Sequence, residues 1–178
     1  MYYQFLLKKL FVDPEQKIRS HVNFLFGKDV GALLPDNLEI EYSRKTGKVR
    51  SFSIDGCLIG TFRTDGGIAL SILGASLFLK SKNFVQNTIV PIDDAIPFVS
   101  EGRSLFIKHI SKCGKNIQCG SDVAILNRNN SVIAVGRSLF SYEYFSRIID
   151  DVSDGEDGNS RHRGIGVKVR EGIKSRTA

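Results

Sequence analysis

The chain has 178 residues, of which 42% are hydrophobic, so it can bury a core as one domain or as two small ones. Its 25 Lys and Arg against 19 Asp and Glu give a net charge of +6, which favours a polyanionic partner such as nucleic acid. Three cysteines are too few for a disulfide scaffold, and no stretch reaches the roughly eighteen apolar residues of a membrane helix. We expect a soluble, cytoplasmic protein with reduced thiols and no membrane partner.

Residues 1–85 have the pattern of a small α+β unit. Apolar residues between positions 5 and 26 recur at intervals typical of a helix face, and Asp13 with Pro14 is a typical helix start, so one or two amphipathic helices are predicted. Strand-like runs follow at 38–43, 48–54, 57–63 and 68–79, separated by glycine-containing turns. These runs predict antiparallel hairpins.

A polar segment at 81–88 predicts a domain boundary, with a second domain over 86–178. Strands are expected at 89–92, 104–110, 122–129, 131–140 and 165–170, with helices at 93–102 and 142–150. This spacing favours a compact antiparallel barrel or sandwich. An acidic insert, residues 150–160, is interpreted as a solvated loop.

The chain ends in a basic run, RHRGIGVKVREGIKSRTA. From Ile165 to Arg170, apolar residues alternate with glycine and basic residues, which is the period of a half-buried strand. The pattern predicts a basic charge held on a folded surface rather than on a solvated tail.

The second half resembles a PUA domain, the RNA-binding pseudobarrel of pseudouridine synthases and archaeosine transglycosylases. The resemblance covers residues 88–173 and rests on the runs VPIDDAIPFVSEGRSLFIKHI, IQCGSDVAILNRNNSVIAVGRSLFS and RGIGVKVREG. The preceding run SRKTGKVRSFSIDGCLIGTFRTDGGIALSILGASLFL is similar to the small domain before PUA in archaeal tRNA-guanine transglycosylase. The implied fold class is α+β, a helix-plus-antiparallel-sheet domain at 1–85 followed by a PUA-type pseudobarrel at 86–178, without the catalytic barrel of that enzyme.

The resemblance implies a tRNA-binding module, because the terminal domains of that enzyme hold the acceptor side of tRNA. Carried over residue by residue, the loop around Glu101 approaches the RNA backbone and the last strand lines the same groove. The chemistry of these residues is consistent with RNA binding, because a glycine lets a phosphate come close to the backbone and Lys and Arg neutralise its charge. The expected RNA-binding residues are Gly102, Arg103, Ser104, Lys108, Arg163, Lys168 and Arg170.

No catalytic set, cofactor or metal is expected, because the histidines and cysteines lack metal-ligand spacing and no nucleophile signature surrounds them. Arg137 either contacts RNA or covers the barrel with the aliphatic part of its side chain. Phe106 is expected to pack in the core of a strand rather than to stack on a base.

These patterns predict a freestanding tRNA-binding module that acts with a separate tRNA-modifying enzyme of the archaeosine transglycosylase type. One alternative is a ribosome-assembly factor that binds rRNA. Another is an enzyme with an unrecognised active site. The identity of the RNA and of the partner, and the oligomeric state, are left open.

Overall fold

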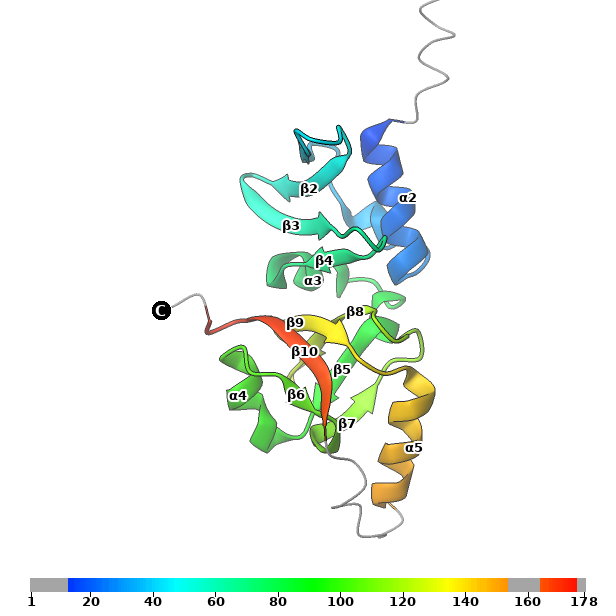
Figure 1. The fold of residues 1–178 in the computed structure, drawn as a ribbon, viewed down its shortest axis with the longest axis vertical. Coiled ribbons are helices and arrows are strands. Elements are labelled where there is room, and N and C mark those ends of the chain that lie inside the picture. The colour runs from blue at the N-terminus through cyan, green and yellow to red at the C-terminus, as the bar shows by residue number, and fades with distance from the viewer. Residues whose placement is uncertain (1–12, 154–163, 176–178) are drawn as a thin grey trace, which may run out of the picture.

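A computed structural model describes residues 13–153 and 164–175 of the chain. They form a four-stranded sheet in the order β1-β2-β3-β4 and a six-stranded sheet in the order β6-β10-β9-β8-β5-β7. In Figure 1 the first sheet and helix α2 lie above the second sheet, which curls between α4 and α5. The expected α+β fold class, a helix with an antiparallel sheet followed by a curled sheet, is confirmed.

Helix α2 (Pro14–Phe26) begins where the sequence predicts. The Asp13 side chain accepts a hydrogen bond from the Glu15 N–H at 3.3 Å, and Pro14 occupies the first turn, where its missing N–H costs nothing. The helix buries Ile18 and Val22 against the first sheet. The helix expected nearer the N-terminus lies outside the described residues.

The predicted hairpins of the first sheet are confirmed. The strands are β1 (Glu39–Tyr42), β2 (Val49–Ile54), β3 (Cys57–Phe62) and β4 (Ile68–Leu70), each antiparallel to the next. Asp55 and Gly56 join β2 to β3 with φ of +48° and +73°, the left-handed conformation that a two-residue hairpin turn requires.

The strand expected over 68–79 is wrong in its second half, which forms helix α3 (Ile72–Phe78). The Ser71 hydroxyl caps this helix by accepting a hydrogen bond from the Gly74 N–H at 3.0 Å. Gly74 also packs on the Ile59 carbonyl, where an added Cβ would lie 2.2 Å from the oxygen. The side-chain cap and the close contact between helix and strand therefore favour a helix here, although the alternation of apolar residues predicted a strand.

The second sheet is built from strands and helices that alternate along the chain. After a 3-10 turn at Phe84–Asn87 come β5 (Thr88–Pro91), a 3-10 turn at Asp93–Ala95, α4 (Ile96–Ser100), β6 (Leu105–Phe106), a 3-10 turn at Ile107–His109, β7 (Ile110–Cys113), β8 (Asp122–Leu126), β9 (Val132–Ser138), α5 (Tyr142–Ser153) and β10 (Ile165–Gly172). Strands β5 and β8 are parallel, whereas the other pairs are antiparallel. The sheet is thus mixed, not wholly antiparallel as predicted.

Two further expectations need correction. The strand predicted over 104–110 is interrupted by the 3-10 turn at Ile107–His109, so Lys108 lies in a turn and Phe106 is 47% exposed rather than in the core. Helix α5 continues to Ser153, so the acidic insert begins within a helix. The remainder of the insert lies outside the described residues.

Strands β8 and β9 are buried on both faces and join the two halves of the chain. Ala124 and Leu126 of β8 belong to the core of the first sheet, whereas Val123 and Ile125 belong to the core of the second. Successive side chains of a strand point to opposite faces, so one strand can contribute to two cores.

The boundary predicted at residue 85 stays a prediction. Within the described ranges, no helix is long and apolar enough to cross a membrane.

Candidate nucleic-acid interface

The loop between α4 and β6 is fixed to the end of β10. Gly102 has a φ of +92°, and its backbone lies so close to β10 that a Cβ added at Gly172 would be 2.5 Å from the Gly102 nitrogen. The Lys174 N–H donates to the Ser100 carbonyl at 2.9 Å. Gly102, predicted from the sequence, thus has a backbone conformation that favours glycine, whereas the close approach of the two segments requires a glycine at Gly172.

Strand β6 runs antiparallel beside β10 at one edge of the six-stranded sheet. Leu105 pairs with Val167 and both are buried, whereas Phe106 pairs with Ile165 and both are exposed. The Ile107 N–H donates to the Gly164 carbonyl at 3.0 Å. The loop and strand from 102 to 108 therefore follow the whole length of β10, as the resemblance implies.

Exposed basic and aromatic side chains gather along this edge. The Arg103 guanidinium lies 5.3 Å from the centre of the Phe98 ring and 3.6 Å from the Glu101 carboxylate. Phe106 meets His109 edge to face at 6.2 Å, and burial lowers the pKa of His109, helped by the charge of Lys108. We call the exposed group the edge surface: Phe98, Arg103, Phe106, Lys108 and Lys168.

The edge surface is short of acid partners. In the part of the chain that the structure describes, Lys108 and Lys168 have no carboxylate within ion-pair distance. Arg103, whose side chain is 67% exposed, has one carboxylate within ion-pair distance in residues 13–153 and 164–175, that of the exposed Glu101. Ser104 lies in the same loop and is half-buried. The edge surface can therefore offer cations, an aromatic face and a closely approachable backbone to one polyanion.

Arg170 does not lie free on this surface, although it is only two residues from Lys168. Its guanidinium makes an ion pair with Asp122 at 3.0 Å and donates to the Leu70 carbonyl at 2.5 Å. Arg170 therefore ties β10 to β8 and to the first sheet. Arg163, also expected to contact RNA, lies outside the described residues.

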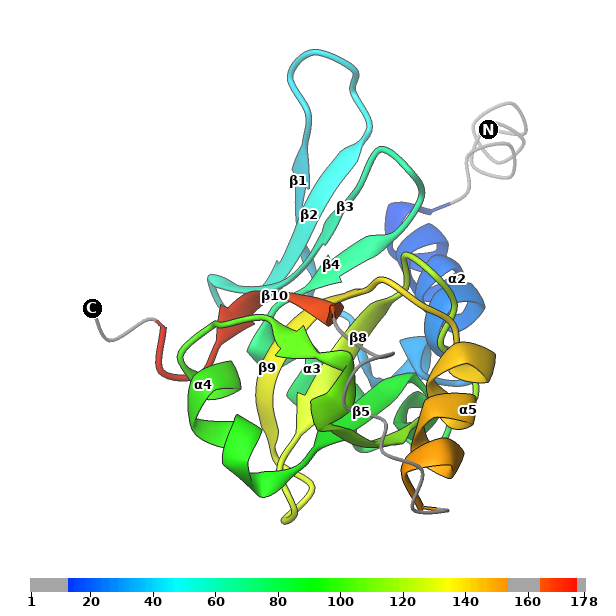
Figure 2. The same cartoon turned by 60° about the horizontal axis from the view of Figure 1, so that its bottom comes forward.

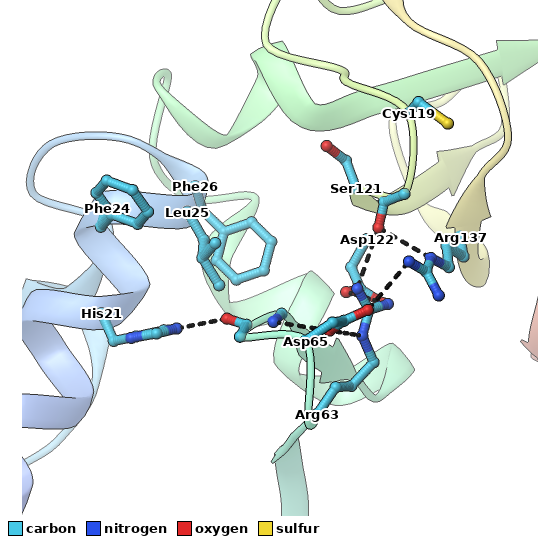
Figure 3. Close-up of a pocket in the computed structure, with 13 residues that line it drawn as sticks. His21, Phe24, Leu25, Phe26, Arg63, Asp65, Cys119, Ser121, Asp122 and Arg137 are labelled. Atoms are coloured by element: carbon cyan, nitrogen blue, oxygen red, sulfur yellow. Dashed lines mark hydrogen bonds and ion pairs between the residues drawn. The ribbon is translucent and has the colours of Figure 1, made fainter.

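The Arg170 ion pair is part of a charged group between the two sheets, which we call the junction cluster: Arg63, Asp65, Asp122, Arg137 and Arg170. Arg63 lies 2.8 Å from Asp122 and 2.9 Å from Asp65 (Figure 3). Burial raises the pKa of Asp122, and the guanidinium groups of Arg63 and Arg170 oppose that shift. The Gly67 N–H and Arg63 lower the pKa of Asp65.

Arg137 is held by polar contacts of its guanidinium group, which neither of the two interpretations of this residue named. Its Nη2 lies 3.0 Å from Asp65, and its Nε donates to the Gly120 carbonyl at 3.1 Å. It lines a surface cavity of about 420 Å³ together with Phe24, which is 84% exposed, and His21, whose Nε2 donates to the Gly66 carbonyl at 2.7 Å. Figure 3 shows α2 on one side of this cavity and the junction cluster on the other.

A metal site or a reactive thiol would give the described residues a further chemistry. Among the described residues, no three His, Cys, Asp or Glu side chains gather to hold a metal ion. Burial raises the pKa of Cys113 to about 11, which keeps its thiol protonated and unreactive near neutral pH.

Two family models match the chain in succession. Residues 16–83 match the patch-forming domain C2 of tRNA-guanine transglycosylase, and residues 87–154 match the PUA domain. The tRNA-guanine(15) transglycosylase of Thermococcus kodakarensis is 31% identical over 91% of this chain and 26% of its own length. That of Methanobrevibacter smithii is 29% identical over 91% of this chain and 23% of its own length. The chain thus spans about a quarter of these relatives, and the resemblance described above is confirmed.

Solved structures show the same fold. A hypothetical protein of Pyrococcus horikoshii superposes with a TM-score of 0.65 at 14% identity, covering 90% of each chain. A PUA domain of Aeropyrum pernix superposes with a TM-score of 0.62 at 12% identity, covering 89% of this chain and 80% of the other. The PUA-type fold of the second half is therefore shown, together with the small domain that precedes it.

Proposed function

We propose that this chain binds structured RNA, most directly a tRNA, through the edge surface, and that it acts beside a separate tRNA-modifying enzyme of the transglycosylase type. The observation that supports this most is the edge surface itself. Among the described residues its cations have few acid partners, and they lie in the loop, the turn and the strand next to the exposed Phe106.

Each part of the edge surface matches a feature of RNA. Gly102 leaves room for a phosphate to approach the backbone, and Arg103, Lys108 and Lys168 neutralise neighbouring phosphates. The exposed ring of Phe106 offers a stacking face for an unpaired base. Such bases are present at the loops and ends of a folded RNA, where proteins read RNA most readily.

The link to tRNA modification rests on the relatives. They are transglycosylases that act on tRNA, and this chain matches about a quarter of their length. The charged side chains of the junction cluster are engaged with one another in ion pairs. A binding role beside a catalytic chain is the function that these side chains fit.

The test compares the binding of a tRNA transcript by the wild-type chain and by an Arg103→Ala, Lys168→Ala variant. Losing two phosphate contacts should reduce the slope of log affinity against log salt by about two, with no change in melting temperature. The matched control is Lys112→Ala, Lys115→Ala, which removes the same charge from β7 and the turn after it, at the opposite edge of the sheet. Equal affinity of both variants would overturn the assignment.

A further inference from the structure

The turn that joins β1 to β2 extends away from the rest of the protein. Figure 2 shows this loop projecting beyond the first sheet, on the side away from the six-stranded sheet. Residues 44–48 are all exposed. We call residues 43–48, with the sequence SRKTGK, the hairpin tip.

The hairpin tip is held in one conformation by its own backbone. The Ser43 N–H donates to the Lys48 carbonyl at 2.8 Å, and the Gly47 N–H donates to the Ser43 carbonyl at 2.8 Å. Gly47 has a φ of +65°, which admits the tight turn. Farther along β2, Phe52 is fully buried in the core, so the tip stands about 15 Å from that anchor at the rise of a strand. The tip is thus a hydrogen-bonded turn that projects from the sheet.

In the described residues the hairpin tip makes no ion pair, although the charge of Arg44 contributes weakly to lowering the pKa of Glu41. Arg44, Lys45 and Lys48 have no carboxylate within ion-pair distance in the described part of the chain. The two acids of β1 are already engaged. The Glu41 carboxylate accepts from the Ser51 hydroxyl at 2.7 Å and from Arg50 at 3.0 Å, and these contacts lower its pKa. Glu39 accepts from the Gly56 N–H at 3.0 Å.

We propose that the hairpin tip is a second RNA contact, which lies along a groove of a double-helical segment and binds the phosphates at its edges. The inference rests on the proposed function and extends it from an edge surface to two separate contacts on one RNA. Two linked contacts favour a large folded RNA over a short one, because the second contact then forms at a high effective concentration.

The chemistry of the hairpin tip favours this partner over a protein. A protein interface has an apolar or aromatic centre, whereas the tip carries only polar and basic side chains and a glycine, with Tyr42 at its base. Double-helical RNA has a deep, narrow groove whose bases side chains cannot read, but whose walls are lined with phosphates. The basic side chains of the hairpin tip can bind these phosphates from outside the groove, without entering it and without reading sequence.

The test uses the full chain, with the triple variant Arg44→Ala, Lys45→Ala, Lys48→Ala, and a tRNA transcript as the probe. The salt slope of binding should fall by about three, and affinity near 0.1 M salt by roughly tenfold or more. The melting temperature should be unchanged because the tip buries nothing. The matched control is Lys80→Ala, Lys82→Ala, Lys115→Ala, which removes the same charge from exposed positions elsewhere.

The outcomes separate this inference from the proposed function. If the Arg103→Ala, Lys168→Ala variant loses binding and the hairpin variant matches its control, the second contact is overturned while the edge surface stands. If the hairpin variant alone loses binding, the tip stands and the edge surface is overturned. If the control weakens as much as the hairpin variant, the effect is one of total charge and the tip has no special role. If the wild-type chain binds no RNA, both are overturned.

Discussion

The edge surface and the junction cluster both contain basic side chains, but these side chains have different surroundings. At the edge surface, Arg103 and Lys168 face solvent, and among the described residues only Glu101 lies within ion-pair distance of either one. At the junction cluster, Arg63 and Arg170 converge on Asp122, whose side chain is only 3% exposed. Lys168 and Arg170 show the contrast within one strand. A basic residue is available to a ligand only where the fold supplies no carboxylate of its own.

The largest effect is expected at the junction cluster. Asp122→Ala leaves two partly buried guanidinium groups without their shared partner, which should cost about 3 kcal/mol of unfolding free energy. Denaturant unfolding measures this loss. Arg103→Ala is the control and should change stability by less than about 0.5 kcal/mol, as surface substitutions do. If both variants had a similar stability, the claim that the junction cluster stabilises the fold and the edge surface does not would be wrong.

A smaller effect is expected where the edge surface meets the end of β10. Gly102→Val forces a branched residue to a φ of +92° and should cost about 1 to 2 kcal/mol, as well as weakening RNA binding by blocking the backbone. Gly56→Val is the matched control, because it has the same kind of strain at a φ of +73° in open space away from the edge surface. Thermal melting and tRNA binding are measured for both. If Gly56→Val weakens RNA binding as much, the loss comes from strain alone.

Much of the fold follows from local sequence. Asp13 with Pro14, the Asp55 and Gly56 turn and the strand alternation near Val167 each specify their element within a few residues. The errors occurred where tertiary contacts decide. The helix at Ile72–Phe78 depends on a side-chain cap and on packing against β3, and the 3-10 turn at Ile107–His109 interrupts an apolar alternation. Neither appears in the hydrophobic pattern alone.

The candidate site was predictable in part. The loop at Gly102 and the strand beside it lie together as the resemblance implied, because β6 pairs with β10. The structural role of Arg170 was not predictable, because its partners Asp122 and Leu70 are distant in sequence. The exposure of Phe106 was missed for a related reason. A short edge strand exposes alternate residues, and the sequence does not tell which face the core will cover.

The central claim is that RNA lies on the edge surface, and amide chemical shifts recorded during titration with a tRNA transcript test it most directly. The chain has a mass of 19.8 kDa, which suits such measurements. We predict that the amides of residues 102–108 and 165–169 shift or broaden first, followed by those of the hairpin tip, while β7 stays unchanged. Perturbations confined to β7 and α5, with residues 102–108 unaffected, would contradict the account.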